Sequence, residues 1–462
     1  MASLAIVGGA GYVGLTYAAA FAARDHDVLS LDIDAAKISA LSTGQSPIFE
    51  PGLDDLLAAG VESGKLRFTT DYAEAIPAAD FVFICVGTPS DANGRAEMSF
   101  VLAAARNIAQ HAQGHTIVVN KSTLPVGSVQ RVVDVLAEHG RPGTSFDVVS
   151  NPEFLREGAA LQDVFRPDRI ILGADDPAAA RRVAGLYASW DAPVIVTDPR
   201  SAEMIKYASN AFLATKISFI NEVAQICERV GADVSAVSFG MGLDERIGPR
   251  FLQAGAGFGG SCFPKDVRAL TTMARDTGID TTMLNAVLAI NAAARRHVLD
   301  AVLDRLERQS QLNGWREPRV AVLGLAFKPD TDDIRESPAL DIIAGLQEAG
   351  VTVRASDPVV RQDASTSLSQ VEVFDDVYAA VAGADAVVLM TEWASYLSLD
   401  FDHLANAMRG RFLFDARNAL DPALVMAAGL DYLGVGRSRP VTADLIAADL
   451  MSPVAHAASA AD

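Results

Sequence analysis

The sequence has 462 residues, of which 50% are hydrophobic, and its formal net charge is −20. A chain of this length has room for two or three domains with full cores. The acidic balance argues against a general binder of nucleic acid or of an anionic membrane surface, although a small phosphorylated ligand needs only a local basic pocket. The three cysteines, Cys85, Cys227 and Cys262, lack CxxC spacing. They indicate neither a disulfide framework nor a zinc site, and they fit a reducing, cytoplasmic compartment.

The two ends of the chain are both rich in apolar residues. The N-terminal stretch LAIVGGAGYVGLTYAAAFAA is about as long as a membrane span, but it contains glycines at turn spacing and no basic residue before Arg24. A signal peptide requires a positive segment at its start, so we interpret this stretch as a buried strand followed by a helix and expect no membrane segment. The alanine-rich tail, 439–462, is predicted to be poorly ordered.

The first half of the chain alternates short apolar runs with amphipathic segments. The runs are typical of parallel strands that are covered on both faces, and together they predict a doubly wound α/β domain. The predicted strands are 3–9, 26–33, 80–87, 115–122, 146–153, 169–173 and 193–198.

The pattern changes after this domain. Residues 201–230 contain neither glycine nor proline and carry apolar residues at helical spacing, which predicts one helix of about 45 Å at 1.5 Å per residue. Such a helix is a common spacer and dimer surface, so we expect at least a homodimer. More helix is predicted from 266 to about 308, and strands resume at 319–327, 351–358, 385–392 and 411–417.

The predicted fold class is therefore α/β, with two doubly wound Rossmann-like parallel-sheet domains joined by a long central helix and a helical middle domain. We expect an N-terminal dinucleotide-binding domain at 1–198, a central helical dimerisation domain at 199–308 and a second Rossmann-like domain at 309–438.

A glycine motif follows the first predicted strand. Gly9, Gly11 and Gly14 form GxGxxG between a strand and a helix, which lets the backbone turn tightly and approach a pyrophosphate at the helix N-terminus. Asp32 ends the second strand, where an acid would bond the ribose hydroxyls and repel a 2′-phosphate. These residues predict NAD as the cofactor. The loops CVGTP (85–89) and KSTLP (121–125) end strands at the same sheet edge, and Cys85 itself is expected in the core.

Four further segments carry polar residues that a core does not need. They are 151–158 (NPEFLREG), the pair Lys206 and Asn210 one helical turn apart, the glycine-rich loop 246–260 with two arginines, and the loop 328–335. Backbone amides of such a glycine-rich loop suit a diphosphate. A solvated helix face is the simpler interpretation of the Lys206–Asn210 pair, and a buried residue in a turn is the simpler interpretation of Cys262 in GFGGSCFPKD.

Taken in order, GAGYVGL, KSTLPVGS, NPEFLREG, KYASNAFLA, GFGGSCFPKD and FKPDTDDIRESP resemble the UDP-glucose/GDP-mannose dehydrogenase family. The resemblance runs from the N-terminus to about residue 436, and the segment 246–266 is most similar to the branch that acts on UDP-glucose. It implies four-electron oxidation of UDP-glucose at C6 to UDP-glucuronate with two NAD. Another nucleotide sugar, GDP-mannose first, is the alternative substrate.

The resemblance also implies catalytic roles. Cys262 would be the nucleophile that holds the sugar first as a thiohemiacetal and then as a thioester. Pro264 suits the first turn of a helix, so Cys262 would lie near a helix N-terminus with Lys265 nearby, and both features favour thiolate. Lys206 and Asn210 would stabilise the oxyanion at C6. Asp266 or Glu157 would activate the hydrolytic water, Glu153 is a weaker third candidate, and Thr123 would order that water.

The remaining site residues also follow from the resemblance. The residues implied to contact NAD, besides the glycines, are Val13, Asp32, Lys37, Thr88, Thr123, Glu157, Lys265 and Arg335. The residues implied to contact the sugar nucleotide are Glu153, Phe154, Leu155, Arg156, Glu157, Lys206, Asn210, Arg250, Phe251, Leu252, Gln253, Ala254, Gly255, Gly259 and Lys328.

Two other classes of protein remain open. An ordinary two-electron dehydrogenase with a helical second domain would not need Cys262. A catalytically silent nucleotide-binding or scaffold protein would tolerate loss of Lys206, Asn210 and Cys262, all of which are present. Neither a metal ion, nor a nucleic acid, nor a membrane is expected as a partner.

Overall fold

The computed structural model describes residues 1–91, 94–314 and 317–437. The chain forms two compact units. The first comprises Met1–Ala214, Ser261–Asn285 and Asp330–Asp332, and the second comprises the described residues of Thr215–Gly260, Ala286–Pro329 and 333–437. The predicted disorder of 439–462 lies outside the described residues, and the division into three domains stays a prediction.

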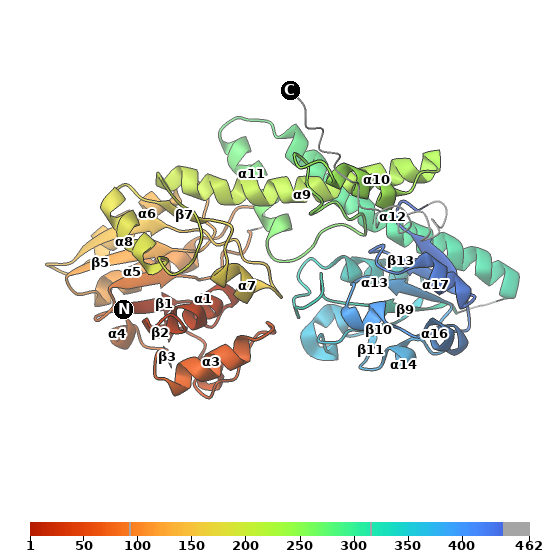
Figure 1. The fold of residues 1–462 in the computed structure, drawn as a ribbon, viewed down its shortest axis with the longest axis horizontal. Coiled ribbons are helices and arrows are strands. Elements are labelled where there is room, and N and C mark those ends of the chain that lie inside the picture. The colour runs from red at the N-terminus through yellow and green to blue at the C-terminus, as the bar shows by residue number, and fades with distance from the viewer. Residues whose placement is uncertain (92–93, 315–316, 438–462) are drawn as a thin grey trace, which may run out of the picture. The chain divides into compact units, whose positions relative to one another are not determined.

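The first unit contains an eight-stranded sheet in the order β3-β2-β1-β4-β5-β6-β7-β8 (Figure 1). The first six strands are parallel, whereas β7 pairs with β6 in antiparallel register and β8 runs parallel to β7. The strands are β1 Ser3–Val7, β2 Asp27–Leu31, β3 Leu66–Thr69, β4 Phe81–Ile84, β5 His115–Asn120, β6 Ser145–Ser150, β7 Ile170–Gly173 and β8 Val194–Thr197.

Helices cover both faces of this sheet. Alternate residues of β1 belong to different hydrophobic clusters, Leu4 and Ile6 to one and Ala5 and Val7 to the other, which is the signature of a doubly wound sheet. The helices are α1 Tyr12–Ala22, α2 Ala35–Leu41, α3 Leu53–Glu62, α4 Tyr72–Ala75, α5 Ser99–His111, α6 Ser128–His139, α7 Ala160–Phe165, α8 Pro177–Leu186 and α11 Phe263–Asp276.

The second unit contains a six-stranded parallel sheet in the order β11-β10-β9-β12-β13-β14. Its strands are β9 Arg319–Leu323, β10 Thr352–Ser356, β11 Glu372–Phe374, β12 Ala386–Leu389, β13 Phe412–Asp415 and β14 Asp431–Gly434. Its helices are α10 Val234–Gly242, most of α12 Thr282–Asn313, α13 Pro338–Glu348, α14 Val377–Val381, α15 Ala394–Leu397, α16 Phe401–Ala407 and α17 Pro422–Ala427, with short 3₁₀ turns at Gln362–Ala364 and Thr366–Leu368.

The long helix expected at 201–230 is confirmed as α9, Pro199–Val230. Its 32 residues correspond to about 48 Å, and its first half belongs to the first unit and its second half to the second. Within the described residues no helix is long and apolar enough to cross a membrane.

The two α/β sheets are confirmed, but three strands were not predicted, namely β3, β11 and β14. Each is short and partly exposed, so it lacks the continuous apolar run that identified the buried strands. The reversal of β7 relative to β6 was also missed, because strand direction is not encoded in an apolar run.

Candidate active site

The glycine motif adopts the predicted strand–turn–helix geometry. Gly11 is the N-cap of α1. A Cβ at Gly9 would lie 1.9 Å from the Ser30 hydroxyl, and one at Gly14 would lie 2.3 Å from the Gly8 carbonyl oxygen, so neither position accepts a side chain. At Gly11 a Cβ would lie 3.3 Å from the same Gly8 oxygen, which is still a tight contact, and a glycine here lets the backbone approach a pyrophosphate closely.

Asp32 lies at the end of β2, beside this turn. It is half-buried, and its carboxylate accepts hydrogen bonds from the backbone N–H groups of Ala10 and Asp34, both at 3.1 Å. An acid in this place fits the ribose of a dinucleotide without a 2′-phosphate. Among the other predicted cofactor residues, Val13 lies in the first turn of α1, Lys37 is exposed on α2, and Thr88 and Thr123 lie in loops after β4 and β5.

Lys206 is buried on α9 and pairs with Glu153, with 2.9 Å between Nζ and Oε1. Burial alone would raise the pKa of Glu153, but the ammonium and the Leu155 N–H, 2.6 Å from Oε2, hold that pKa below its usual range. Burial likewise opposes the charge on Lys206, yet Glu153, Cys262 and Asp266 raise its pKa. A lysine that stays charged in a dry site is suited to stabilising an oxyanion.

Asn210 lies one turn after Lys206, and its amide donates to Oδ2 of Asp266 at 2.6 Å. The Lys265 ammonium donates to the other oxygen, Oδ1, at 2.5 Å. Asp266 is 1% exposed and is held in the first turn of α11 by its N–H, which donates to the Cys262 carbonyl at 2.9 Å. The structure therefore brings together four of the predicted catalytic residues, and the solvated-face interpretation of α9 is wrong at these positions.

Cys262 is the N-cap residue of α11, and Pro264 lies in the first turn as predicted. The expectation that this position favours thiolate is not met. Burial raises the pKa of the Cys262 thiol, Glu153 and Asp266 raise it further, and Lys206 and the Ser261 hydroxyl lower it only in part. Lys265 was expected to stabilise a thiolate, but its ammonium is bonded to Asp266. The surroundings of Cys262 therefore disfavour its ionised form relative to a free cysteine.

Glu157 is connected to Cys262 through the hydroxyl of Ser261. Its Oε1 accepts from the Ser261 hydroxyl at 3.1 Å and its Oε2 from the Thr331 hydroxyl at 3.4 Å. The Ser261 hydroxyl also lies 3.4 Å from Sγ of Cys262. Glu157 is thus connected to the sulfur through the Ser261 hydroxyl, and Asp266 lies one helical turn after Cys262.

The other residues of the segment 151–158 make contacts of different kinds. The Phe154 ring lies 5.3 Å from Nζ of Lys206 and 3.8 Å from the Arg169 guanidinium, while Leu155 packs against the core. Arg156 is exposed and forms a bidentate pair with Asp163, with a closest distance of 2.5 Å. The Phe154 ring therefore lies near two cations, of which Lys206 is buried, and Arg156 is paired within its own loop.

The second unit carries the predicted sugar-nucleotide loop. Leu252 and Ala254 are buried in its core, Arg250 and Gln253 are exposed, and Phe251 adopts a left-handed φ of +65°. The Gly255 N–H donates to Asn221 Oδ1 at 2.8 Å, and a Cβ at Gly255 or Gly259 would meet a backbone oxygen at 2.5 or 2.3 Å. Leu252 and Ala254 can therefore offer a ligand only backbone atoms.

Two loops at the edge of the second sheet carry basic side chains. Lys328 lies 5.6 Å above the Phe327 ring, and Arg335 is exposed and pairs with Asp333 at 2.7 Å. The sequence analysis missed Arg417, which follows β13 and pairs with Glu392 at 2.7 Å. Burial would raise the pKa of Glu392, but Arg417 and Lys328 hold it low, so the cations at this edge are partly balanced by a carboxylate.

Asp357 directly follows β10, as Asp32 directly follows β2. The two positions correspond, since β10 pairs in parallel with β9 as β2 pairs with β1. Asp357 is 0% exposed and accepts from the N–H groups of Leu325 and Ala326 and from the Trp393 indole at 2.7, 3.1 and 3.2 Å. Its carboxylate is fully engaged within the protein, unlike that of Asp32.

Lys121 is a second residue that the sequence analysis passed over, although it lies in the quoted KSTLP loop. It is 1% exposed, and its ammonium lies 2.9 Å from Asn151 Oδ1, 3.3 Å from the Tyr187 hydroxyl and 3.8 Å from the centre of the Tyr17 ring. Burial lowers the pKa of Lys121 to about 7. Only its position directly after an apolar strand hinted at burial.

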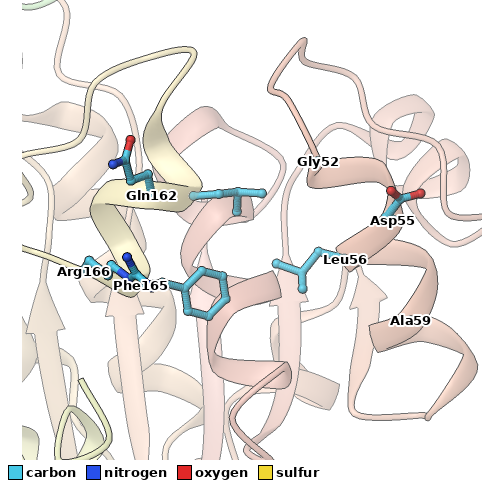
Figure 2. A pocket seen from close by; sticks show the side chains of 8 residues that line it. Gly52, Asp55, Leu56, Ala59, Gln162, Phe165 and Arg166 are labelled. Atoms are coloured by element: carbon cyan, nitrogen blue, oxygen red, sulfur yellow. The ribbon is translucent and has the colours of Figure 1, made fainter. Parts of the chain in front are cut away.

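A cavity of about 420 Å³ opens between α3 and α7, away from the catalytic cluster. Figure 2 shows Leu56 of α3 and Phe165 of α7 pointing toward one another across it. Within the described residues, no group of three or more His, Cys, Asp or Glu could hold a metal ion. Cys85 and Cys227 are buried free thiols, as predicted for Cys85.

Three family models match this chain. They describe the NAD-binding, central and UDP-binding domains of the UDP-glucose/GDP-mannose dehydrogenase family, and they cover residues 2–191, 200–293 and 321–422. This chain belongs to the UDP-glucose/GDP-mannose dehydrogenase family. The family resemblance and the fold class are thereby confirmed, and the first unit carries the family's NAD-binding domain.

Named relatives within this family are similar over almost the whole chain. The UDP-glucose 6-dehydrogenase TuaD of Bacillus subtilis is 45% identical over 95% of this chain and 94% of its own. The UDP-glucose 6-dehydrogenase of Rhizobium meliloti is 47% identical over 93% and 98%. The structure of a UDP-glucose dehydrogenase from Pyrobaculum islandicum is similar with a TM-score of 0.86 at 40% identity, over 94% of this chain and 98% of that one.

Proposed function

We propose that this protein oxidises UDP-glucose at C6 to UDP-glucuronate and consumes two NAD for each sugar. The observation that carries the proposal is the cluster formed by the buried side chains of Lys206, Asn210, Asp266 and Glu153 with the half-buried Cys262, in the same unit as the NAD-binding domain. A two-electron dehydrogenase has no use for the cysteine, and a silent scaffold has no use for the buried charges. The relatives named UDP-glucose 6-dehydrogenase support UDP-glucose as the substrate.

The chemistry proceeds in three stages. When bound, NAD accepts a hydride in each of the two oxidations. In the first, the C6 alcohol loses a hydride and a proton and becomes an aldehyde. Sγ of Cys262 then adds to C6, which forms a thiohemiacetal, and loss of a second hydride and proton gives a thioester. Water finally cleaves the C–S bond, which releases the carboxylate and returns the thiol.

The side chains around the sulfur have complementary roles. The Lys206 ammonium and the Asn210 amide stabilise the oxyanion that develops at C6, a contribution of about 3 kcal/mol for each donor. Burial raises the pKa of the Cys262 thiol, and the Lys206 ammonium is the neighbouring cation that opposes this shift and favours negative charge on sulfur. Asp266 or Glu157 accepts the proton of the hydrolytic water, which Thr123 orders.

The UDP part of the substrate is assigned to the second unit. The backbone of 251–255 and Gly259, with Arg250 and Lys328, offers amides and cations to a nucleoside diphosphate. Of the residues assigned to NAD, Arg335 is the one in this unit. Arg417 adds a guanidinium at the same sheet edge as Lys328.

We further propose a homodimer that forms through α9. Phe212, Phe219 and Ile226 recur every seven residues and are 65%, 46% and 55% exposed. Side chains at this spacing lie on one stripe of a helix, and an exposed apolar stripe on a 32-residue helix fits a helix of a second copy.

The deciding experiment counts NADH. Complete conversion of a limiting amount of UDP-glucose is expected to give two NADH per sugar, with UDP-glucuronate as the product. One NADH per sugar would reject the four-electron reaction. Two NADH from GDP-mannose, with none from UDP-glucose, would keep the chemistry and replace the substrate. The control is Cys262→Ala, for which no second NADH is expected.

A further inference from the structure

Glu50 is an acidic residue that the mechanism does not use, although it is only 7% exposed. It lies just before α3 and accepts four hydrogen bonds. Oε2 accepts from the Tyr12 hydroxyl and from the Gly158 N–H at 2.7 Å, and Oε1 accepts from the N–H groups of Ala160 and Leu161 at 2.8 and 3.4 Å. A carboxylate this buried is stable only when donors surround it.

One side of this arrangement belongs to the cofactor turn. Tyr12 is the Y of GAGYVG and the first residue of α1, and its hydroxyl also lies 2.8 Å from the Gly158 N–H. Burial and the carboxylate of Glu50 raise the pKa of Tyr12 well above its ordinary value, so its hydroxyl keeps its proton and acts as a donor. The Gly158 N–H thus donates to both the Tyr12 hydroxyl and the Glu50 carboxylate.

The other side belongs to the sugar segment. Gly158 follows Glu157, which accepts from Ser261 at 3.1 Å, and the Ser261 hydroxyl lies 3.4 Å from Sγ of Cys262. Gly158 itself has a φ of +76°, and a Cβ there would lie 2.5 Å from the Asp330 carbonyl oxygen. This close approach leaves room only for glycine, and because Gly158 is bonded directly to Glu157, we expect a shift of the Gly158 N–H to move Glu157 as well.

We infer that Tyr12 and Glu50 form a clasp, defined by these two side chains and the Gly158 N–H, that couples dinucleotide binding to nucleotide-sugar binding. This inference rests on the proposed function. Hydrogen bonds lead from Tyr12 of the cofactor turn through Glu50 to Gly158, the peptide bond joins Gly158 to Glu157, and Glu157 accepts from Ser261, the residue before Cys262; all of them lie in the first unit. A dinucleotide bound at the turn would hold Tyr12 against the Glu50 carboxylate and so favour the geometry of the sugar segment that binds the nucleotide sugar.

Tyr12 and Glu50 are therefore positioning residues, and a purely structural role has to be separated from this one. Glu50 also joins α3 to the N-terminal turn of α7, the two helices that border the cavity in Figure 2. Tyr12→Phe removes one hydroxyl and leaves the three backbone hydrogen bonds of Glu50 in place. A structural clasp would lose stability in this variant, but it would not lose coupling between two ligands.

The test measures coupling directly. The dissociation constant of NADH is measured by its fluorescence without and with saturating UDP-glucose, a pair that cannot react because the cofactor is already reduced. For the unaltered protein we expect UDP-glucose to tighten NADH binding about fivefold or more. In Tyr12→Phe and Glu50→Gln we expect this ratio to fall close to one, while NADH binding alone changes about twofold or less. Calorimetry of UDP-glucose with and without NADH must return the same ratios, because coupling is reciprocal.

Asp55→Asn is the matched control, because Asp55 is an exposed acid of α3 outside the clasp and should leave the ratio unchanged. The inference is overturned if the unaltered protein shows no coupling, or if both clasp variants keep its ratio. Failure of the proposed function has a different signature. In that case the unaltered protein binds NADH but makes none from UDP-glucose, and the ratio is measured with the nucleotide sugar that it does oxidise.

Discussion

At the scale of single residues, the site depends on charges that are buried in contact with one another. Lys206 and Glu153 lie 2.9 Å apart, and Asp266 is bonded by both Asn210 and Lys265. Each charge is tolerable because its partner is present, so removal of one partner leaves an uncompensated buried charge. Neutral isosteres are therefore better probes of this site than alanine.

Hydrolysis of the thioester separates the two candidate bases. Asp266 is buried one helical turn from Cys262, whereas Glu157 is bonded to two hydroxyls. We expect Asp266→Asn to release about two NADH per active site in a burst and then to stall, with turnover slowed by about 10²- to 10⁴-fold. Glu157→Gln should turn over faster than Asp266→Asn.

Rapid-quench kinetics and intact-protein mass spectrometry measure the burst and the sugar bound to sulfur. Asp276→Asn, at the far end of α11, should show no burst followed by a stall. If Glu157→Gln accumulates the adduct and Asp266→Asn does not, the two roles are exchanged.

The burial of Lys121 leads to a prediction about how the free energy of unfolding depends on pH. Its pKa falls from 10.5 to about 7 in the folded protein, so between these values the unfolded chain binds the extra proton. The free energy of unfolding therefore gains a contribution that rises with pH from about 7 to about 10.5, by up to about 1.4 kcal/mol per pH unit, and is flat below this window.

Denaturant titrations of the unaltered protein and of Lys121→Met, each at several pH values, measure this contribution as a difference. The unaltered protein should gain stability over the variant as the pH rises through the window. Lys37→Met, at an exposed lysine, should give a flat difference. A flat difference for Lys121→Met as well would show that the buried ammonium keeps an ordinary pKa.

At the scale of elements, α9 presents two faces of different character. Its buried face presents Lys206 and Asn210, and its exposed stripe presents Phe212, Phe219 and Ile226. The sequence predicted the helix because its apolar spacing was uninterrupted. It could not show which polar positions are buried, because the partner of Lys206 lies 53 residues away in the chain.

The exposed stripe of α9 leads to a prediction about assembly. Phe219→Asp together with Ile226→Asp should raise the dimer dissociation constant by about 100-fold or more, because each exposed apolar side chain that is buried contributes about 1.5–3 kcal/mol. Sedimentation velocity over a range of concentrations measures the shift. Leu312→Asp, at a residue 84% exposed at the end of α12, should leave the association unchanged. A monomer in the unaltered protein would contradict the proposal.

At the scale of the whole molecule, the order of the motifs along the chain predicted the fold and the family better than any single motif did. Both sheets, the long helix and the glycine turn were predicted, since each leaves a continuous local pattern. The edge strands β3, β11 and β14 left none. The roles of Glu50 and Lys121 could not be read either, because each follows from burial by segments that are distant in the chain. Local sequence patterns identified the helices and strands, whereas contacts between distant segments determine which polar side chains are buried.

The two strand-end carboxylates described above have a consequence for the timing of the reaction. Asp357 has its hydrogen-bonding capacity filled from within, and Asp32 does not. Of these two carboxylates, Asp32 is the one with capacity left for a ribose, so under the proposed function both oxidations would use the same dinucleotide site in turn. The first NADH would then have to leave while the oxidised sugar stays bound to Cys262, and its residence time would set how long that covalent bond must last.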